Sequence, residues 1–260
     1  MHPPSAHGAG PIAIESFDLA AFAFLFDVDG TLIDIAPTPQ SVQVPNSLRR
    51  NLQQLGGLTG GATALVSGRP LHDLDRLFGP LGLALIGGHG AELRLWHGGS
   101  AHEQRAAPLP EWIRQRCMAI AAAGENILLE DKGYSIAIHY RLAPDRERPI
   151  RAAAAAILAE APAGEIEALH GKAVVEIKRT GRSKGSGIRA LMAHAPFAGR
   201  RPVFVGDDIT DEDAFAVMPE FGGLALSVGR TVAGAERRFE TPADVRHWIE
   251  RICRASGQSC

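Results

Sequence analysis

The sequence predicts an α/β protein in which a helix-flanked parallel sheet is interrupted by a smaller antiparallel module. Short apolar strands alternate with helical segments near both ends of the chain. Between them, a helix is followed by two adjoining strands, and this order occurs twice. The composition agrees, because 45% hydrophobic and 22% charged residues are typical of an ordinary globular chain.

The first part of the chain alternates strands and helices. The expected strands are short apolar runs, at 21–26, 62–66 and 83–86. The expected helices lie between them, at 46–55 and 70–78. Leucines at three- and four-residue spacing indicate the first helix, and Pro70 suits the first turn of the second. This order predicts parallel strands joined by crossover helices.

The pattern changes near Pro108. A helix at 111–123 precedes strands at 126–130 and 134–141, and a helix at 145–160 precedes strands at 165–169 and 173–178. Within the second strand, the larger apolar residues alternate with smaller or polar ones: Tyr134, Ile136, Ile138 and Tyr140. Such alternation is typical of a strand with one buried face. We therefore expect a small antiparallel sheet with two helices.

After Gly181 the first pattern resumes. Its expected elements are a helix at 183–193, a strand at 202–205, a helix at 210–217, a strand at 224–228 and a final helix from Thr241. Thr210 with Asp213 resembles a capping box at the start of the second of these helices. We thus expect a core made of 18–107 and 180–256, with 108–179 inserted. Residues 1–17 are rich in Pro, Gly, Ala and His, and we expect them to be poorly ordered.

The gross properties exclude several classes of function. A net charge of −2 gives no basic field for nucleic acid. No apolar run approaches the ~20 residues of a membrane span, and no signal peptide is apparent. Cys117, Cys253 and Cys260 are widely spaced and predict reduced thiols rather than a zinc site. We expect a cytoplasmic protein that binds neither nucleic acid nor membrane. The sequence does not fix the oligomeric state, for which we expect a monomer.

Polar side chains follow three core strands at the points where these strands end: Asp27, Asp29 and Thr31, then Ser67, then Asp207, Asp208 and Asp211. Ligands of open α/β sheets bind at the carboxyl ends of the strands. Clustered carboxylates need a cation, and Mg²⁺ prefers oxygen ligands and phosphate partners. Lys184, at the start of a helix, adds a charge that suits phosphate. Each residue alone is more often a cap or a surface group, but the complementary set predicts a magnesium and phosphate site.

These residues also carry a resemblance. DVDGT, SGR, the lysine of SKG and GDDITDEDAF, in that order, resemble the four motifs of the haloacid-dehalogenase (HAD) phosphatase superfamily. A narrower resemblance, to the trehalose-6-phosphate phosphatase family, spans about Phe22 to Trp248. Its segments are DVDGTLIDIAPTP, LVSGRP, GGHGAE, EDKGYSIAIHYR, GKAVVEIKRTGRSKG and VFVGDDITDEDAF. The resemblance implies a Rossmann-like HAD core with an inserted α+β cap of the C2 type, and trehalose 6-phosphate as substrate.

The resemblance implies a role for each core residue. Asp27 would attack phosphorus and form an aspartyl-phosphate, and Asp29 would be the general acid and then the base. Thr31 and Ser67 would bind phosphoryl oxygens, and Lys184 would neutralise charge.

The same resemblance implies a metal site and its surroundings. Asp27, the backbone carbonyl of Asp29, and Asp207 would hold Mg²⁺. Asp208 and Asp211 would hold metal-bound waters or orient Lys184.

Recognition of the sugar falls to further residues. From the cap module, the resemblance implies Glu130, Lys132 and Glu176, with His139 and Arg141 as additional members. From the core loops, it implies Gly30, Arg69, His89 and Glu92. Packing within the sheet is the alternative for His139, and a structural role is the alternative for the loop that carries His89.

Other functions share part of this pattern. A sucrose-phosphate or mannosylphosphoglycerate phosphatase would share the core residues but should not need Glu130, Lys132 and Glu176 together. A phosphomutase would need an aspartyl-phosphate that outlives attack by water, which no residue indicates. A non-catalytic sugar-phosphate-binding regulator would usually lack the nucleophile or the acid, and both Asp27 and Asp29 are present.

Overall fold

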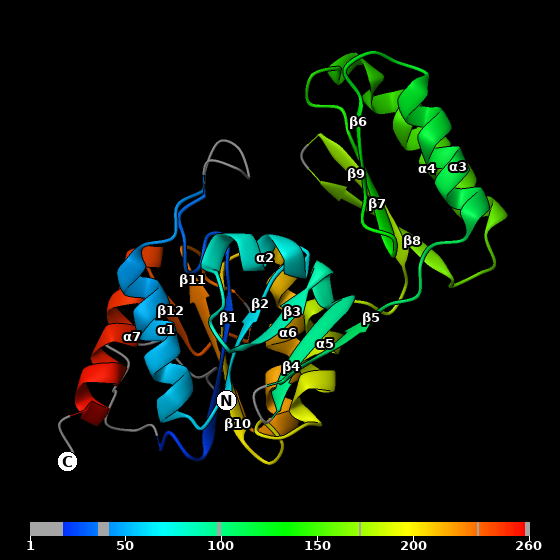
Figure 1. Cartoon of the computed structure of the whole chain (residues 1–260). Coiled ribbons are helices and arrows are strands. Elements are labelled where there is room, and N and C mark those ends of the chain that lie inside the picture. Colours follow the sequence, from blue (N-terminus) through cyan, green and yellow to red (C-terminus); the bar gives the residue numbers. More distant parts are fainter. Residues whose placement is uncertain (1–17, 36–41, 98–99, 172, 233, 258–260) are drawn as a thin grey trace, which may run out of the picture. The chain divides into compact units, whose positions relative to one another are not determined.

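The computed structural model describes residues 18–35, 42–97, 100–171, 173–232 and 234–257. They form two compact units (Figure 1). The core unit comprises the described residues of Met1–Gln104 and Ser183–Cys260, and the cap unit is Arg105–Arg182. The expectation for residues 1–17 lies outside the described residues. None of the helices in the described ranges has the length and apolar character that crossing a membrane would need.

The core unit contains an eight-stranded sheet in the order β12-β11-β10-β1-β2-β3-β4-β5 (Figure 1). Its strands are β1 (Phe22–Asp27), β2 (Thr63–Val66), β3 (Ala84–Gly87), β4 (Glu92–His97), β5 (Ser100–Arg105), β10 (Arg201–Gly206), β11 (Leu224–Val228) and β12 (Arg237–Phe239). The strands from β12 to β3 are parallel, and β4 is antiparallel to β3. Because β1 lies between β10 and β2, the carboxyl ends of these three strands share one edge of the sheet.

Helices cover both faces of this sheet. Residues of α1 (Asn46–Leu58), α2 (Leu71–Phe78) and α7 (Pro242–Gly257) pack with Phe24 and Phe26 of β1. Residues of α5 (Lys184–Met192) and α6 (Glu212–Val217) pack with Ala23 and Leu25, which point to the other face. All six residues of β1 are buried. Burial on both faces explains the continuous apolar run and makes β1 a rigid support for the residues at its end.

The cap unit contains a four-stranded antiparallel sheet in the order β6-β7-β9-β8. Its strands are β6 (Leu128–Asp131), β7 (Ser135–His139), β8 (Ile166–Gly171) and β9 (Val174–Arg179), and its helices are α3 (Glu111–Ala122) and α4 (Glu147–Glu160). Ile136 and Ile138 of β7 pack in one cluster with Ile113 of α3 and Ile150 of α4. The alternate residues Ser135 and Ala137 therefore lie on the opposite face of the sheet.

The predicted fold class is confirmed, and the sequence-based prediction missed three strands. No element was expected at β4 and β5, where ELRLWH follows a glycine-rich turn, or at β12, which has only 3 residues. The predicted helix 210–217 is in fact a 3₁₀ turn, η5 (Ile209–Asp211), followed by α6. The capping box is formed by Asp208 and Asp211 instead of Thr210 and Asp213, so the predicted box lies two residues too far along the chain.

Candidate active site

A buried ion-pair cluster lies at the carboxyl end of β1. Lys184 Nζ, at the start of α5, lies 2.6 Å from Asp27 Oδ1 and 2.6 Å from Asp211 Oδ1. All three residues are buried, with 3% of Lys184, 4% of Asp27 and none of Asp211 exposed. Ser183 caps α5 by accepting a hydrogen bond from Ser186 N, which fixes the turn from which Lys184 extends. One ammonium thus joins residues far apart in the sequence.

The cluster has more negative than positive groups. Burial raises the pKa of Asp27 well above its ordinary value, against the opposing charge of Lys184. Burial would lower the pKa of Lys184, but the charges of Asp27 and Asp211 raise it above the ordinary value. Burial and the charge of Asp211 also raise the pKa of Asp207. Lys184 therefore stays charged, and the carboxylates around it would be stabilised by another cation.

Asp207 follows β10 and is held close to the chain that follows β1. Thr31 Oγ1 donates to Asp207 Oδ1 at 3.2 Å, and a Cβ placed on Gly30 would lie 2.1 Å from Asp207 Oδ2. Gly30 has φ of +84°, a conformation that L residues rarely adopt. Both observations explain the glycine of DVDGT. No motif pointed to Arg230, whose Nε donates to the backbone carbonyl of Asp207 at 2.8 Å.

Asp211 holds the turn after β10 together. Its Oδ2 accepts hydrogen bonds from the backbone N–H groups of Asp207 and Asp208, each at 3.0 Å. Since its Oδ1 contacts Lys184, both of its oxygens have partners. This arrangement favours the Lys184-orienting role over direct metal binding. Asp208 is exposed, and its Oδ1 accepts from Ile209 N at 2.7 Å.

The residues present fit a divalent cation. Carboxylate oxygens of Asp27, Asp207 and Asp211 all lie within 4.8 Å of one another. Oxygen ligands of this kind suit Mg²⁺. Because Asp211 is engaged by Lys184 and two N–H groups, Asp27 and Asp207 are the carboxylates best placed to hold the ion.

Asp29 points its carboxylate at Arg69. Arg69 Nε lies 2.6 Å from Asp29 Oδ2, and Nη2 lies 2.7 Å from Oδ1, which makes a bidentate pair. The hydrogen bonds to Asp29 raise the pKa of Arg69 above its ordinary value, and burial opposes this rise without cancelling it. The neighbouring Ser67 is 1% exposed, and its Oγ accepts from Arg69 N at 3.1 Å. The SGR turn therefore lies beside both the strand end and Asp29.

The loop that carries His89 and Glu92 supports this turn. His89 adopts a left-handed conformation with φ of 51°, and a Cβ on Gly68 would lie 2.3 Å from its Nε2. Glu92 is 3% exposed, and its Oε2 accepts from Leu71 N at 2.7 Å, at the start of α2. The contacts of Glu92 favour a structural role over contact with substrate.

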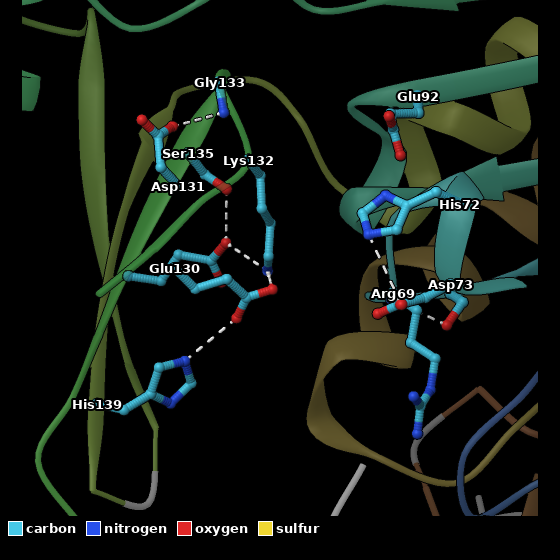
Figure 2. A network of polar contacts seen from close by, with 12 residues as sticks. Arg69, His72, Asp73, Glu92, Glu130, Asp131, Lys132, Gly133, Ser135 and His139 are labelled. Atoms are coloured by element: carbon cyan, nitrogen blue, oxygen red, sulfur yellow. Dashed lines mark hydrogen bonds and ion pairs between the residues drawn. The ribbon is translucent and has the colours of Figure 1, made fainter. Parts of the chain in front are cut away.

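In the cap unit, charged side chains form a chain of contacts (Figure 2). Glu130 and Glu176 both pair with Ala137, on the sheet face opposite the helices. His139 Nε2 lies 3.2 Å from Glu130 Oε2, and Lys132 Nζ lies 4.0 Å from Glu130 Oε1 and 3.2 Å from Glu176 Oε1. Four of the five residues expected from the cap are thus brought together. Arg141 lies in the exposed turn after β7.

Ser135 is the member of this cluster that the sequence-based reasoning missed. Its Oγ donates to Glu176 Oε1 at 2.7 Å. The alternation that buries Ile136 and Ile138 also places Ser135 on the face that bears Glu176, so the same periodicity offered the signal.

The fold and the core site define the class of protein first. A parallel α/β core with an inserted antiparallel cap, and with carboxylates, a lysine and a hydroxyl at the strand ends, resembles the HAD phosphatases. Two structures share the fold. One is a trehalose-6-phosphate phosphatase related protein, with a TM-score of 0.72 and 22% identity over 92% of this chain and 100% of the other. The other is a Bacteroides thetaiotaomicron phosphatase of the haloalkanoate (HAD) superfamily, with a TM-score of 0.60 and 14% identity over 94% and 99%.

Within that class, the chain belongs to the trehalose-phosphatase family. The profile of this family matches residues 25–241. The chain is 40% identical to the trehalose-6-phosphate phosphatase of Escherichia coli K12 over 239 residues, which cover 92% of this chain and 89% of the other. It is 39% identical to a probable trehalose-phosphate phosphatase of Sinorhizobium fredii over 240 residues, with the same coverage. Members of this family are phosphoric monoester hydrolases.

Proposed function

We propose that this chain hydrolyses trehalose 6-phosphate to trehalose and phosphate with Mg²⁺, through an aspartyl-phosphate on Asp27. The observation that carries the proposal is the contact of Lys184 with Asp27, 2.6 Å apart at the end of β1, in a chain 40% identical to a trehalose-6-phosphate phosphatase. A carboxylate can act as nucleophile when it is held ionised and in place. The contact with Lys184 supports both conditions.

The proton and the phosphate are handled by neighbouring residues. Asp29 protonates the leaving sugar oxygen and then takes a proton from the attacking water. To do so it must leave its pair with Arg69, whose guanidinium keeps the carboxylate in one orientation until the sugar is bound. Ser67 and Thr31 donate to phosphoryl oxygens, and Lys184 neutralises the charge that phosphate brings beside Asp27.

Asp27, Asp207 and the backbone carbonyl of Asp29 would hold Mg²⁺, with Asp208 near bound water. When present, the ion supplies charge that favours ionised carboxylates and binds phosphate oxygens. Asp211 orients Lys184 from the other side. Gly30 leaves room for Asp207, because any side chain at this position would overlap its carboxylate.

The cap residues recognise the sugar in this proposal. Glu130, Lys132, His139 and Glu176 present acceptors and donors on one face of the cap sheet, and these suit sugar hydroxyls. A site of polar groups rejects substrates that lack matching hydroxyls. Arg141 and His89 are further candidates for contact with the sugar. The cytoplasmic location and the monomeric state remain predictions from the sequence.

A panel of sugar phosphates tests the proposal. Phosphate release is measured from trehalose 6-phosphate, sucrose 6-phosphate and glucose 6-phosphate, with Mg²⁺ and with excess EDTA. We expect turnover with Mg²⁺ and a clear preference for trehalose 6-phosphate. Comparable turnover of glucose 6-phosphate would refute the assignment of trehalose 6-phosphate as the preferred substrate. Full activity in EDTA would refute the need for Mg²⁺.

A further inference from the structure

Ser135 occupies a buried position on the same face of the cap sheet as Glu176. It is the first residue of β7, is 1% exposed, and pairs with Lys178 of β9. Glu176 lies two residues from Lys178 on β9 and pairs with Ala137. Ser135 and Glu176 are therefore diagonal neighbours on one face, a separation that a side chain can bridge. A side chain this buried is poorly placed to touch a sugar itself.

The hydroxyl of Ser135 is directed at a charged group. Its Oγ donates to Glu176 Oε1 at 2.7 Å, and Lys132 Nζ lies 3.2 Å from the same oxygen (Figure 2). A hydrogen bond to a carboxylate is stronger than one between neutral groups. The backbone of Ser135 is also engaged, because its carbonyl accepts from Lys132 N at 2.9 Å. One residue thus holds the carboxylate of Glu176 and the turn that carries Lys132.

We propose that Ser135 is a positioning residue for sugar recognition, which fixes the carboxylate of Glu176 beside Lys132 before the substrate binds. Glutamate has three rotatable side-chain bonds, and a free Glu176 would lose that freedom on binding. A hydrogen bond from a buried strand residue removes the freedom beforehand, which is the usual benefit of preorganisation. This inference rests on the proposed function, in which Glu176 contacts the sugar. Ser135 acts through Glu176 and takes no part in the chemistry at Asp27.

Steady-state kinetics of Ser135→Ala test the inference, with trehalose 6-phosphate and 4-nitrophenyl phosphate as substrates. We expect the KM for trehalose 6-phosphate to rise on the order of tenfold, the scale of a lost hydrogen bond to a charged group, while its kcat stays within about twofold. Turnover of the nitrophenyl ester, which lacks the sugar, should stay within about twofold. An unchanged KM, or equal losses on both substrates, would overturn the inference.

Matched variants separate positioning from a loss of stability. Ser135→Thr keeps the hydroxyl, so its KM for trehalose 6-phosphate should stay within about threefold of the wild-type value. Ser135→Val has a side chain of similar shape without the hydroxyl, and its KM should rise as in Ser135→Ala. Ser227→Ala removes another hydroxyl that is 1% exposed, in β11 of the core unit, and should change neither KM. Its Oγ has no hydrogen-bond partner among the described residues. Equal impairment of the Thr and Val variants would contradict the role of the hydroxyl.

A double-mutant cycle asks whether the effect passes through Glu176. In a Glu176→Ala background, Ser135→Ala should raise the KM for trehalose 6-phosphate no further. Additive effects would show that Ser135 acts by another route and would overturn the inference. The proposed function is tested separately by the wild type, which must prefer trehalose 6-phosphate to the nitrophenyl ester. Without that preference both proposals fail, whereas with it an unaffected Ser135→Ala variant refutes only the role of Ser135.

Discussion

Replacement of Lys184 by methionine should destabilise the core unit strongly. The side chain of Lys184 is 4% exposed, and those of its partners Asp27 and Asp211 are 5% and 0% exposed. Methionine has a similar length and no charge, so two buried carboxylates would lose their shared cation. Removal of one partner from a buried ion pair typically costs about 3–5 kcal/mol. We expect a loss of this size in the free energy of unfolding.

Urea unfolding followed by circular dichroism, in EDTA, measures this loss. Arg189→Met is the control, because Arg189 is a cation of the same helix whose pair with Glu220 is 51% and 45% exposed. Its loss should be much smaller, since exposed pairs are screened by solvent. A Lys184→Met variant within about 1 kcal/mol of the wild type would refute the reasoning, because it would mean that the buried carboxylates do not need the ammonium.

A second substitution sharpens the same test. Asp211→Asn should destabilise the wild type, because it removes one partner of Lys184. In the Lys184→Met background it should instead recover stability, because it removes one of two uncompensated buried charges. If Asp211→Asn changed the free energy of unfolding in the same direction in both backgrounds, the charge balance described for the site would be contradicted.

Three other predictions concern separate parts of the chain. Glu130→Ala should raise the KM for trehalose 6-phosphate by about tenfold and spare 4-nitrophenyl phosphate, and equal losses in steady-state assays would remove Glu130 from sugar recognition. Gly30→Ala would place a Cβ 2.1 Å from Asp207 Oδ2 and so displace a proposed ligand of Mg²⁺. The Mg²⁺ concentration needed for half-maximal thermal stabilisation should therefore rise by roughly tenfold or more. An unchanged Mg²⁺ titration would contradict this steric conflict. Burial raises the pKa of the Cys117 and Cys253 thiols to about 11. At pH 8 only about one thiol in a thousand is then ionised, so a disulfide reagent should modify both far more slowly in the folded than in the unfolded protein, and rapid modification of either when folded would refute this.

The order of strands and helices could be predicted because each carries a local signal. The apolar run of β1 ends at Asp27, and the alternation in β7 shows which face is buried. Strands β4 and β12 were missed for different reasons. The alternating ELRLWH adds to the sheet antiparallel to β3, against the parallel pattern before it, and a strand of 3 residues such as β12 leaves almost no periodicity.

For the site, the sequence predicted which residues lie there better than it predicted which of them contact one another. The carboxyl ends of parallel strands meet at one edge, and this rule alone brings Asp27 and Asp207 together. No such rule gives the direction of a side chain, so the pairing of Asp29 with Arg69 followed only from the structure. The capping box illustrates the same limit. Its sequence pattern fits Asp208 with Asp211 as well as Thr210 with Asp213, and only the structure shows that Asp208 and Asp211 form it and that Asp211 also contacts Lys184.

The most direct test of the central claim examines the substrate and the role of Asp27 in one experiment. Trehalose and phosphate are quantified together after incubation of trehalose 6-phosphate and Mg²⁺ with the wild type or with Asp27→Asn, which keeps the shape of the side chain and loses its charge. We predict equal amounts of both products from the wild type and near-complete loss of both in the variant, whose circular dichroism spectrum should still be that of a folded protein. Release of trehalose by a folded Asp27→Asn variant at the wild-type rate, or no release by the wild type, would contradict the account.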